Sequence, residues 1–253
     1  MTDTIQHLIG LFPQRAVPKC LRSLVGRMTV LGRERESRKL LVYFGRLLHQ
    51  QFFISATDGN LSVRLDDRIL ATPTGMSKGM MLPKDLVIVD LGGARIKGRR
   101  EVSSEIDMHL LIYKMRPDVR AVVHAHPYTA TGFASAGIAL DEPLCSEVVM
   151  TLGEVPLAPY ATTGTTELSR SLAPFVFKHN AILMANHGVV SYGETLLQAY
   201  QRMEAVEHFA RIVLVTHQLG KKNLLSDTEI EKLLMAKDRY FNHWRKAQLR
   251  APA

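Results

Sequence analysis

Two histidines separated by one residue follow an apolar run in the segment "VVHAHP" (122–127). Alternate side chains of a β-strand share one face, so in a strand His124 and His126 would stand about 6.6 Å apart along the chain. Their rings could then tilt onto a single metal ion at roughly 2.0–2.1 Å each. The pair could equally be two ordinary strand residues, one hydrogen-bonded and one solvated. Two ligands do not retain a metal, so the pair indicates a metal site only if the chain supplies further ligands.

A third histidine and a glutamate are the candidates for completing such a site. His187 follows the apolar run "AILMAN" and directly precedes Gly188, and with the pair it makes the three imidazoles typical of a catalytic zinc site with one open position. The other histidines lie in or beside helix patterns, where a solvated or capping role is usual: His7, His49, His109, His179, His208, His217 and His243. Glu105 stands at the start of an expected helix, where it could be a fourth ligand or a base. It could also be only a first-turn carboxylate favoured by the helix dipole, and the spacing leaves these interpretations open.

Three short segments rich in small polar residues form a second group. They are "DGNLS" (58–62), "TPTG" (72–75) and "SSE" (103–105). Such loops offer backbone N–H groups and hydroxyls, and Ser103 and Ser104 precede a helix N-terminus, which is suitable chemistry for a phosphate monoester. Each segment alone is more ordinary as a turn or a cap. Together with three histidines they predict a cradle for a phosphorylated substrate.

The spacing of apolar residues predicts the elements that must hold these side chains. Helices are expected within 34–53, 103–119, 128–137, 165–177, 194–220 and 226–244. Strands are expected as hairpins turned at 66–67 and 92–93, a strand at 120–126, a proline-flanked edge strand at 155–160 and a buried strand at 180–188. The pattern predicts a single α/β domain over 35–253, with a central, mainly antiparallel β-sheet flanked by helices on both faces. Residues 1–34 are expected to form an N-terminal helical extension.

Composition narrows the class of protein and the kind of partner. The 253 residues are 46% hydrophobic and 22% charged, as in an ordinary soluble globular protein. The net charge of +8 comes from 32 basic and 24 acidic residues, and the basic residues are scattered along the chain, which favours anionic small molecules over nucleic acid as partners. Cys20 and Cys145 are too few for a disulfide framework, so we expect a reducing, cytoplasmic location. No apolar run reaches the ~18 residues of a membrane span.

An ordered set of motifs resembles a known family. The segments "GNLSVR", "ILATPTG", "SSEIDMHLLIY", "RPDVRAVVHAHP", "APYATTGTTEL" and "ANHGVV" occur in the order and spacing of the class II aldolase/adducin family. Within that family the likeness is greatest to the L-fuculose-1-phosphate aldolase branch, and it covers roughly residues 35–241. The resemblance implies the fold of that family, a bound divalent metal (zinc, with manganese or cobalt as alternatives), and a homotetramer whose active sites lie between subunits.

The resemblance also implies roles for individual residues. His124, His126 and His187 match the zinc ligands, and Glu105 matches the acid/base that also touches the resting metal. The residues that match the phosphate-binding loops are Asn60, Thr74, Gly75, Ser103 and Ser104, with Gly59 beside them. Tyr240 falls where the aldolase has a mobile C-terminal tyrosine, although it could instead pack in an apolar stripe with neighbouring aromatic residues.

Two departures from the aldolase pattern affect the expected chemistry. The aldolase has a tyrosine, contributed by a neighbouring subunit, in the segment matching "DEPLCSEVV", where this chain has Cys145, Ser146 and Glu147. The related ribulose-phosphate 4-epimerases carry Asp at the position of Glu105, which argues against that branch. Methylthioribulose-phosphate dehydratases use a Glu near the position of Glu147, so a sugar-phosphate dehydratase remains an alternative.

The resemblance therefore predicts an enzyme, a metal-dependent carbon–carbon lyase. It would reversibly cleave a ketose 1-phosphate, such as L-fuculose 1-phosphate or 5-deoxyribulose 1-phosphate, to dihydroxyacetone phosphate and a short aldehyde. The metal would stabilise the enediolate, and Glu105 would move the proton. The alternative of another class is a non-catalytic scaffold like the adducin head, which shares the fold without the metal ligands.

Overall fold

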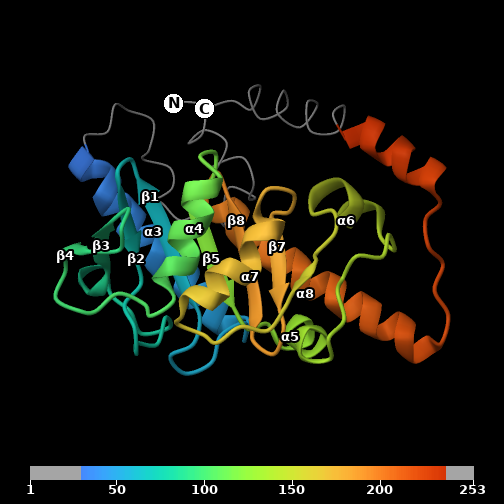
Figure 1. Cartoon of the computed structure of the whole chain (residues 1–253), viewed down its shortest axis with the longest axis horizontal. Helices are drawn as coiled ribbons and strands as arrows, with labels where there is room; N and C mark the ends of the chain where they lie inside the picture. Colours follow the sequence, from blue (N-terminus) through green and yellow to red (C-terminus); the bar gives the residue numbers. More distant parts are fainter. Residues whose placement is uncertain (1–29, 238–253) are drawn as a thin grey trace, which may run out of the picture.

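Eight strands form one sheet at the centre of the protein, whose residues 30–237 are described by a computed structural model (Figure 1). Their order across the sheet is β4-β3-β2-β1-β5-β8-β7-β6. The strands are β1 (Asn60–Leu65), β2 (Arg68–Ala71), β3 (Val87–Asp90), β4 (Arg95–Lys97), β5 (Ala121–Ala125), β6 (Leu157–Ala158), β7 (Ala181–Met184) and β8 (Gly188–Gly193). All neighbouring pairs are antiparallel except β6 and β7, which pair in parallel at the edge.

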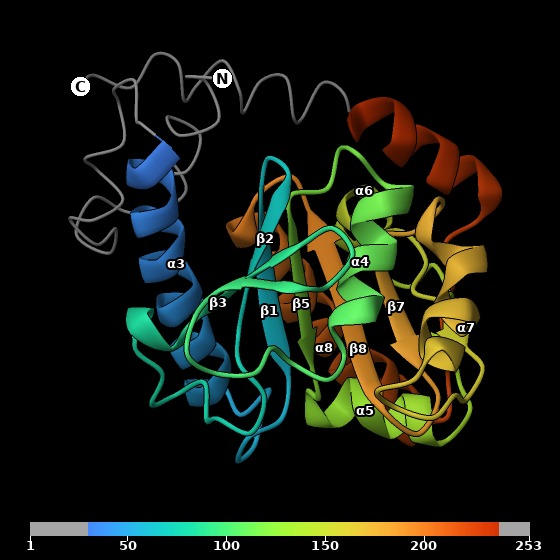
Figure 2. The same cartoon turned by 60° about the vertical axis from the view of Figure 1, so that its left-hand side comes forward.

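Helices cover both faces of this sheet. Those on one face are α3 (Val30–Gln50), α5 (Tyr128–Ser135) and α8 (Leu196–Leu219), and those on the other are α4 (Ile106–Met115) and α7 (Thr166–Val176). Figure 2 shows α4 and α7 in front of the strands and α8 behind them. Because successive strand residues point to opposite faces, Val122 joins the core under α4 and α7, whereas Val123 joins the core under α3 and α8. The predicted α/β fold, a mainly antiparallel sheet between two layers of helices, is confirmed.

The turn between β7 and β8 differs from the prediction. A buried strand was expected to continue to Gly188, but β7 ends at Met184 and Gly188 already begins β8. The chain reverses at Asn186, whose φ of 55° lies in the left-handed region that asparagine tolerates. β8 is buried on both faces and therefore lacks the polar alternation that marks a half-exposed strand. The short helices α6 (Ser146–Thr151) and η1 (Pro83–Asp85) were also not predicted.

Several predictions concern residues beyond 30–237 or the boundary of that range. α3 begins at Val30, four residues before the helix expected from residue 34. Tyr240 and residues 1–29 lie outside the described residues, so the helical extension over 1–34 and the domain boundary at 35 stay predictions. Residues 227–237 are helical and form the start of the expected final helix. Within residues 30–237 no helix has the length and apolar character needed to cross a membrane.

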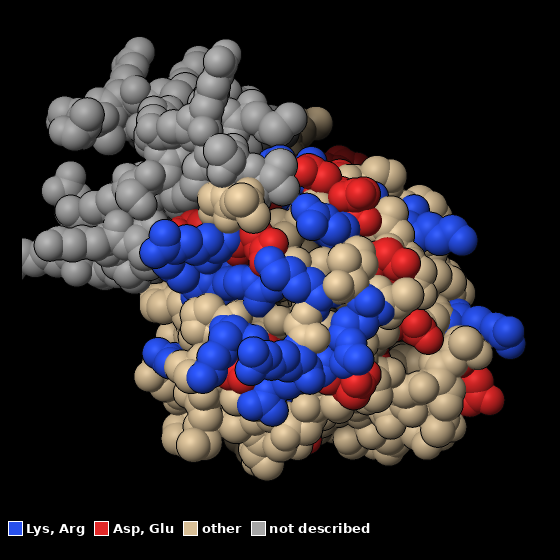
Figure 3. All heavy atoms as spheres, turned by 90° about the vertical axis from the view of Figure 1, so that its left-hand side faces the viewer, with Lys and Arg blue, Asp and Glu red and all other residues tan. Residues whose placement is uncertain are grey.

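Basic side chains that are scattered in the sequence gather in space on one face. Figure 3 shows this face, which lies to the left in Figure 1 around α3 and β4. Acidic neighbours neutralise part of its charge. Glu34 pairs with Arg38 at 2.9 Å and with Lys97 at 3.1 Å, and Asp85 pairs with Arg100 at 2.8 Å. The face around α3 and β4 therefore carries both basic side chains and the acidic residues that pair with some of them.

Candidate metal centre and active site

The ends of two neighbouring sheet elements bring three histidines together. His124 is the fourth residue of β5, His126 directly follows that strand, and His187 lies in the turn between β7 and β8. One ring nitrogen from each lies within 4.8 Å of the others, and the ring centroids are 4.7–5.1 Å apart. Gly188 permits this approach, because a Cβ atom there would lie 2.4 Å from the His126 ring. The cluster predicted from the sequence is therefore present.

The contacts made by the Nδ1 atoms of His124 and His126 leave the Nε2 lone pair of each directed into the cluster. His124 Nδ1 donates to the Val189 carbonyl oxygen at 2.9 Å, so Nε2 carries the lone pair, and the His126 Nδ1 faces Asp58 Oδ2 at 3.6 Å. The two Nε2 atoms are 3.0 Å apart. Burial lowers the pKa of His124 well below its ordinary value and lowers that of His126 as well, which favours neutral imidazoles. Converging neutral imidazoles fit a divalent metal such as zinc.

Glu105 faces the same point from the start of α4. Its Oε1 lies 3.2 Å from His187 Nε2 and its Oε2 lies 3.3 Å from His124 Nε2. Burial raises the pKa of this carboxyl, but His187 and a hydrogen bond from Asn60 Nδ2 at 2.8 Å favour the ionised form, so that the pKa lies below its ordinary value. Glu105 is itself the residue that caps α4, and its N–H donates to Ser103 Oγ at 3.3 Å. The Glu105 carboxylate therefore makes no hydrogen bond that caps α4, and it faces the histidine cluster instead.

The three polar loops converge beside this carboxylate. Asn60, the first residue of β1, pairs with His124 across β1 and β5. Gly59 has φ of +67°, and a Cβ there would lie 2.8 Å from the His124 carbonyl oxygen, so only glycine lets the loop approach β5 so closely. The loop 72–75 runs beside 101–104 through two backbone bonds, Ser103 N to Thr72 O at 3.2 Å and Thr74 N to Glu101 O at 3.1 Å. Thr74, Gly75 and Ser104 are exposed there.

A lysine that carried no signal in the sequence is buried between two of these loops. Lys78 follows Gly75 by three residues, and only 2% of its surface is exposed. Its ammonium donates to the Thr57 carbonyl oxygen, at the start of the loop that carries Asn60. Burial lowers the pKa of Lys78 to about 8, although the charges of Asp58 and Glu105 raise it. An ammonium has three N–H donors and this one has a single described acceptor, so it is suited to a further anionic partner.

His109 was assigned from the sequence to an ordinary helical role, but it is 1% exposed and belongs to the site. Its Nε2 lies 2.5 Å from Asn60 Oδ1, and its Nδ1 lies 2.7 Å from Ser62 Oγ. Its spacing of four residues from Glu105 places both on one side of α4. The four-residue spacing was the available sequence signal for His109, but every helix contains many residue pairs with that spacing, so it did not single out this histidine.

Comparison with known proteins agrees with this geometry. The family model described as "Class II Aldolase and Adducin N-terminal domain" matches residues 39–214. The chain belongs to the class II aldolase and adducin family. It is 34% identical over 207 residues to a 5-deoxy-D-ribulose 1-phosphate aldolase of Bacillus thuringiensis (81% of this chain, 95% of the relative), and 35% identical over 202 residues to a 3-oxo-tetronate 4-phosphate decarboxylase of Haemophilus influenzae (78% and 95%). A solved L-fuculose 1-phosphate aldolase has 32% identity and a TM-score of 0.73, covering 78% of this chain and 94% of its own.

These matches confirm the predicted resemblance and the prediction of an enzyme. Relatives named as aldolases span most of the chain, at about 34% identity. Class II aldolases are metal-dependent, and the three-histidine cluster is a group that could hold the ion. The scaffold alternative, which lacks the metal ligands, does not fit these residues.

Other residues considered for class II aldolase chemistry are not brought to the cluster. Cys145 precedes α6, and Ser146 and Glu147 are its first two residues. Figure 1 shows α6 at one end of the sheet and α5, which follows His126, at the other. Among the described residues no hydrogen bond or ion pair joins the Glu147 side chain to the histidines. Within a single copy of the chain this segment therefore lies at the other end of the sheet from the candidate site.

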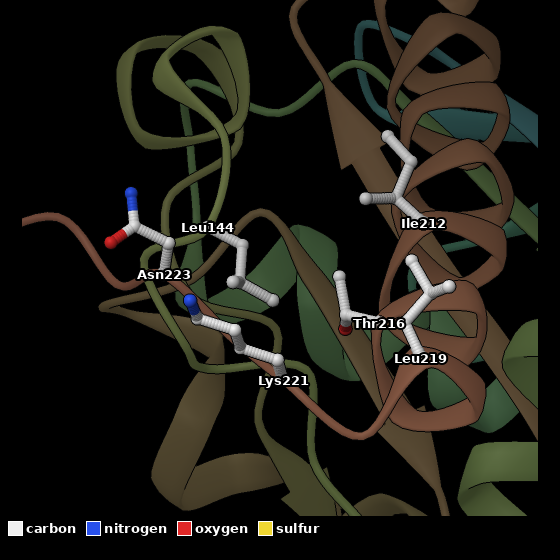
Figure 4. A pocket seen from close by; sticks show the side chains of 6 residues that line it. All are labelled: Leu144, Ile212, Thr216, Leu219, Lys221 and Asn223. Carbon is white, nitrogen blue, oxygen red and sulfur yellow. The ribbon is translucent and has the colours of Figure 1, made fainter.

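A hollow elsewhere on the enzyme does not have the residues for this chemistry. It measures about 600 Å³ and lies where the end of α8 meets the segment that follows it. Figure 4 shows its lining residues, which are Leu144, Ile212, Thr216, Leu219, Lys221 and Asn223. These residues include no histidine or carboxylate, so the hollow is separate from the candidate metal centre.

Proposed function

We propose that the chain is a metal-dependent lyase that breaks the bond between the α- and β-carbons of a phosphorylated ketone and forms dihydroxyacetone phosphate. The observation that carries this proposal is the Glu105 carboxylate, which lies 3.2–3.3 Å from two of three converging histidines. A metal site with a carboxylate beside it provides both charge stabilisation and a proton acceptor at one point. That combination is what formation of a carbanion next to a ketone requires.

His124, His126 and His187 would hold the ion, with Glu105 touching it before substrate arrives. Zinc is the ion this nitrogen donor set favours, and manganese and cobalt are the alternatives. When bound, a divalent cation supplies Lewis-acid stabilisation of negative charge developing on substrate oxygens. In the direction of condensation the Glu105 carboxylate would remove a proton from the nucleophilic carbon of dihydroxyacetone phosphate, and in the direction of cleavage the protonated Glu105 carboxylic acid would deliver a proton to that carbon. The lowered pKa of Glu105 keeps it ionised before condensation.

The phosphate of the substrate would bind at the polar loops. Asn60, Thr74, Gly75, Ser103 and Ser104 offer amide and hydroxyl donors there, with Gly59 allowing Asn60 to approach. Lys78 would add the one buried positive charge of this cradle, because its ammonium lies between loop 57–60 and loop 72–79 and has one described acceptor. A phosphate dianion beside it would add a close counter-charge to those of Asp58 and Glu105 and would offset the loss of hydration on burial.

The aldolase and decarboxylase relatives are named for reactions that share one step, the formation and protonation of a carbanion next to a ketone. Cleavage of a 5-deoxyribulose 1-phosphate between C3 and C4 releases acetaldehyde, and loss of carbon dioxide from a 3-oxo-tetronate 4-phosphate breaks the bond between C1 and C2. In both reactions the electron pair passes to the ketone of the same three-carbon phosphate, which then takes a proton at carbon. The aldol reaction also needs a base for the C4 hydroxyl, whereas decarboxylation does not. We favour the aldolase, with the decarboxylase as second candidate because a decarboxylase relative is 35% identical.

The hydroxyl base of the aldol reaction would come from Tyr240 or from the segment 145–147. Because α6 and the histidine cluster lie at different ends of the sheet (Figure 1), Glu147 would reach a cluster only in another copy of the chain. A role for Glu147 would therefore require an assembly with active sites between subunits, such as the homotetramer that the family resemblance implies. The cytoplasmic location stays an expectation from the cysteine content.

The test is a pair of assays on purified full-length protein loaded with zinc. Incubation with dihydroxyacetone phosphate and a panel of short aldehydes should give a ketose 1-phosphate. Incubation with 3-oxo-tetronate 4-phosphate should release carbon dioxide only if the second candidate holds. Activity in neither assay, with metal bound, would refute the proposed reaction class.

A further inference from the structure

A buried chain of polar side chains leads away from Glu105 into the core. Glu105 Oε2 accepts from Asn60 Nδ2 at 2.8 Å, and Asn60 Oδ1 lies 2.5 Å from His109 Nε2. His109 Nδ1 lies 2.7 Å from Ser62 Oγ, which lies 2.7 Å from the Tyr113 hydroxyl. All these atoms belong to side chains of which at most about a tenth is exposed. The chain starts at the candidate base and ends at a tyrosine within the core under α4.

The chemistry of the groups fixes the direction of every bond. An ionised carboxylate only accepts, so the Asn60 group that faces Glu105 must be the NH₂, and Asn60 Oδ1 must then accept from His109. His109 therefore carries its proton on Nε2 and accepts at Nδ1 from the Ser62 hydroxyl. Ser62, having donated its proton, accepts from Tyr113. Burial lowers the pKa of His109 to about 4 and raises that of Tyr113, so both groups are in the neutral forms this order needs.

We propose that His109 is a positioning residue, which holds the Asn60 amide so that its two N–H groups face Glu105 and the phosphate loops. The inference rests on the proposed function, because it assigns the second N–H of Asn60 to the substrate phosphate. Without a donor at Oδ1 the amide loses its preferred orientation. Its carbonyl oxygen can then turn toward the carboxylate and the phosphate, both of which repel it.

Two substitutions of similar size separate this role from simple core packing. In His109→Gln the amide nitrogen replaces Nε2 and can still donate to Asn60. In His109→Asn the shorter amide replaces Nδ1, keeps the contact with Ser62 and no longer reaches Asn60. If His109 only packs in the core and satisfies its hydrogen bonds, both variants should lose thermal stability, and the two should bind the substrate with equal affinity.

Binding of dihydroxyacetone phosphate to the zinc-loaded full chain, measured by calorimetry, gives the answer. We expect His109→Asn to bind about ten- to a hundredfold more weakly than the parent, and His109→Gln within about threefold of it. In an Asn60→Ala background His109→Asn should weaken binding no further. Equal affinities in the Gln and Asn variants, or additive losses with Asn60→Ala, would overturn the assignment.

A spectroscopic measurement tests the same inference without substrate. The nitrogen-15 signals of the His109 ring, identified by their loss in His109→Gln, should show a neutral ring protonated at Nε2. A proton on Nδ1 would overturn the inference whatever reaction the enzyme performs. Failure of the parent to bind dihydroxyacetone phosphate, with the Nε2 tautomer present, would instead count against the proposed function.

Discussion

Replacing Lys78 by glutamine removes the buried charge of the proposed phosphate cradle and keeps a polar side chain with N–H donors that is one atom shorter. Lys78 is 2% exposed and its ammonium has one described acceptor, so a bound phosphate would add a direct ionic partner. Losing one hydrogen bond to a charged group costs roughly 1.5–3 kcal/mol, which is about 10- to 150-fold in affinity. We therefore expect Lys78→Gln to bind dihydroxyacetone phosphate within that range of weakening, with zinc content unchanged.

The pH dependence of binding gives this prediction a second signature. Burial lowers the pKa of Lys78 to about 8, so its charge, and the affinity it adds, is present below that pH. A phosphate monoester is a dianion above about pH 7, and it raises the lysine pKa when bound. The parent should therefore lose affinity as the pH rises through about 8 and above. Lys78→Gln should show little change over the same interval, because it has no such group to titrate.

Calorimetric titration at several pH values between about 7 and 9 is the assay, with Lys84→Gln as the matched control. Lys84 is an exposed lysine six residues further along and should bind as the parent does. Parental affinity in Lys78→Gln at neutral pH would refute the reasoning. A parent whose affinity does not fall above pH 8 would show that the Lys78 ammonium does not face the phosphate.

Two further substitutions test the metal centre and the cradle separately. His187→Ala should bind zinc at least about tenfold more weakly while the chain stays folded, measured by elemental analysis after dialysis, and equal metal content would remove His187 from the ligands. Ser104→Ala should weaken dihydroxyacetone phosphate binding by roughly 1.5–3 kcal/mol at parental zinc content, measured by calorimetry. Unchanged affinity in that variant would move the phosphate away from the start of α4.

The histidine cluster could be predicted because its signals are local. His124 and His126 are two residues apart at the end of an apolar strand, and His187 precedes a glycine after another. Alternate residues of a strand share one face, which places His124 and His126 together, and the end of the neighbouring strand brings His187 close to them. The sheet and its two helix layers could also be predicted, because the spacing of apolar residues marks helices and strands of ordinary length. β8 was missed because burial on both faces removes the alternation on which such a prediction depends.

The supporting residues could not be predicted because their partners are distant in sequence. His109 acts through Asn60, which is 49 residues away. Lys78 is held by Thr57, 21 residues earlier, and a lysine in a loop ordinarily points to solvent. Glu207 lies on α8 and accepts hydrogen bonds from the Thr129 and Ala130 backbone at the start of α5, directly after the segment that carries His124 and His126. Each role depends on which elements the fold places side by side.

The central claim is that Glu105 moves the proton at the carbon of dihydroxyacetone phosphate. Glu105→Gln keeps the volume and the contact with Asn60 but removes the base, and three histidines should still hold the zinc. Exchange of the hydroxymethylene proton of dihydroxyacetone phosphate with deuterated water isolates this step, because it needs no aldehyde and breaks no carbon–carbon bond. We expect exchange to slow by about 10²–10⁴-fold in the zinc-loaded variant. Exchange at the parental rate with zinc bound would contradict the account.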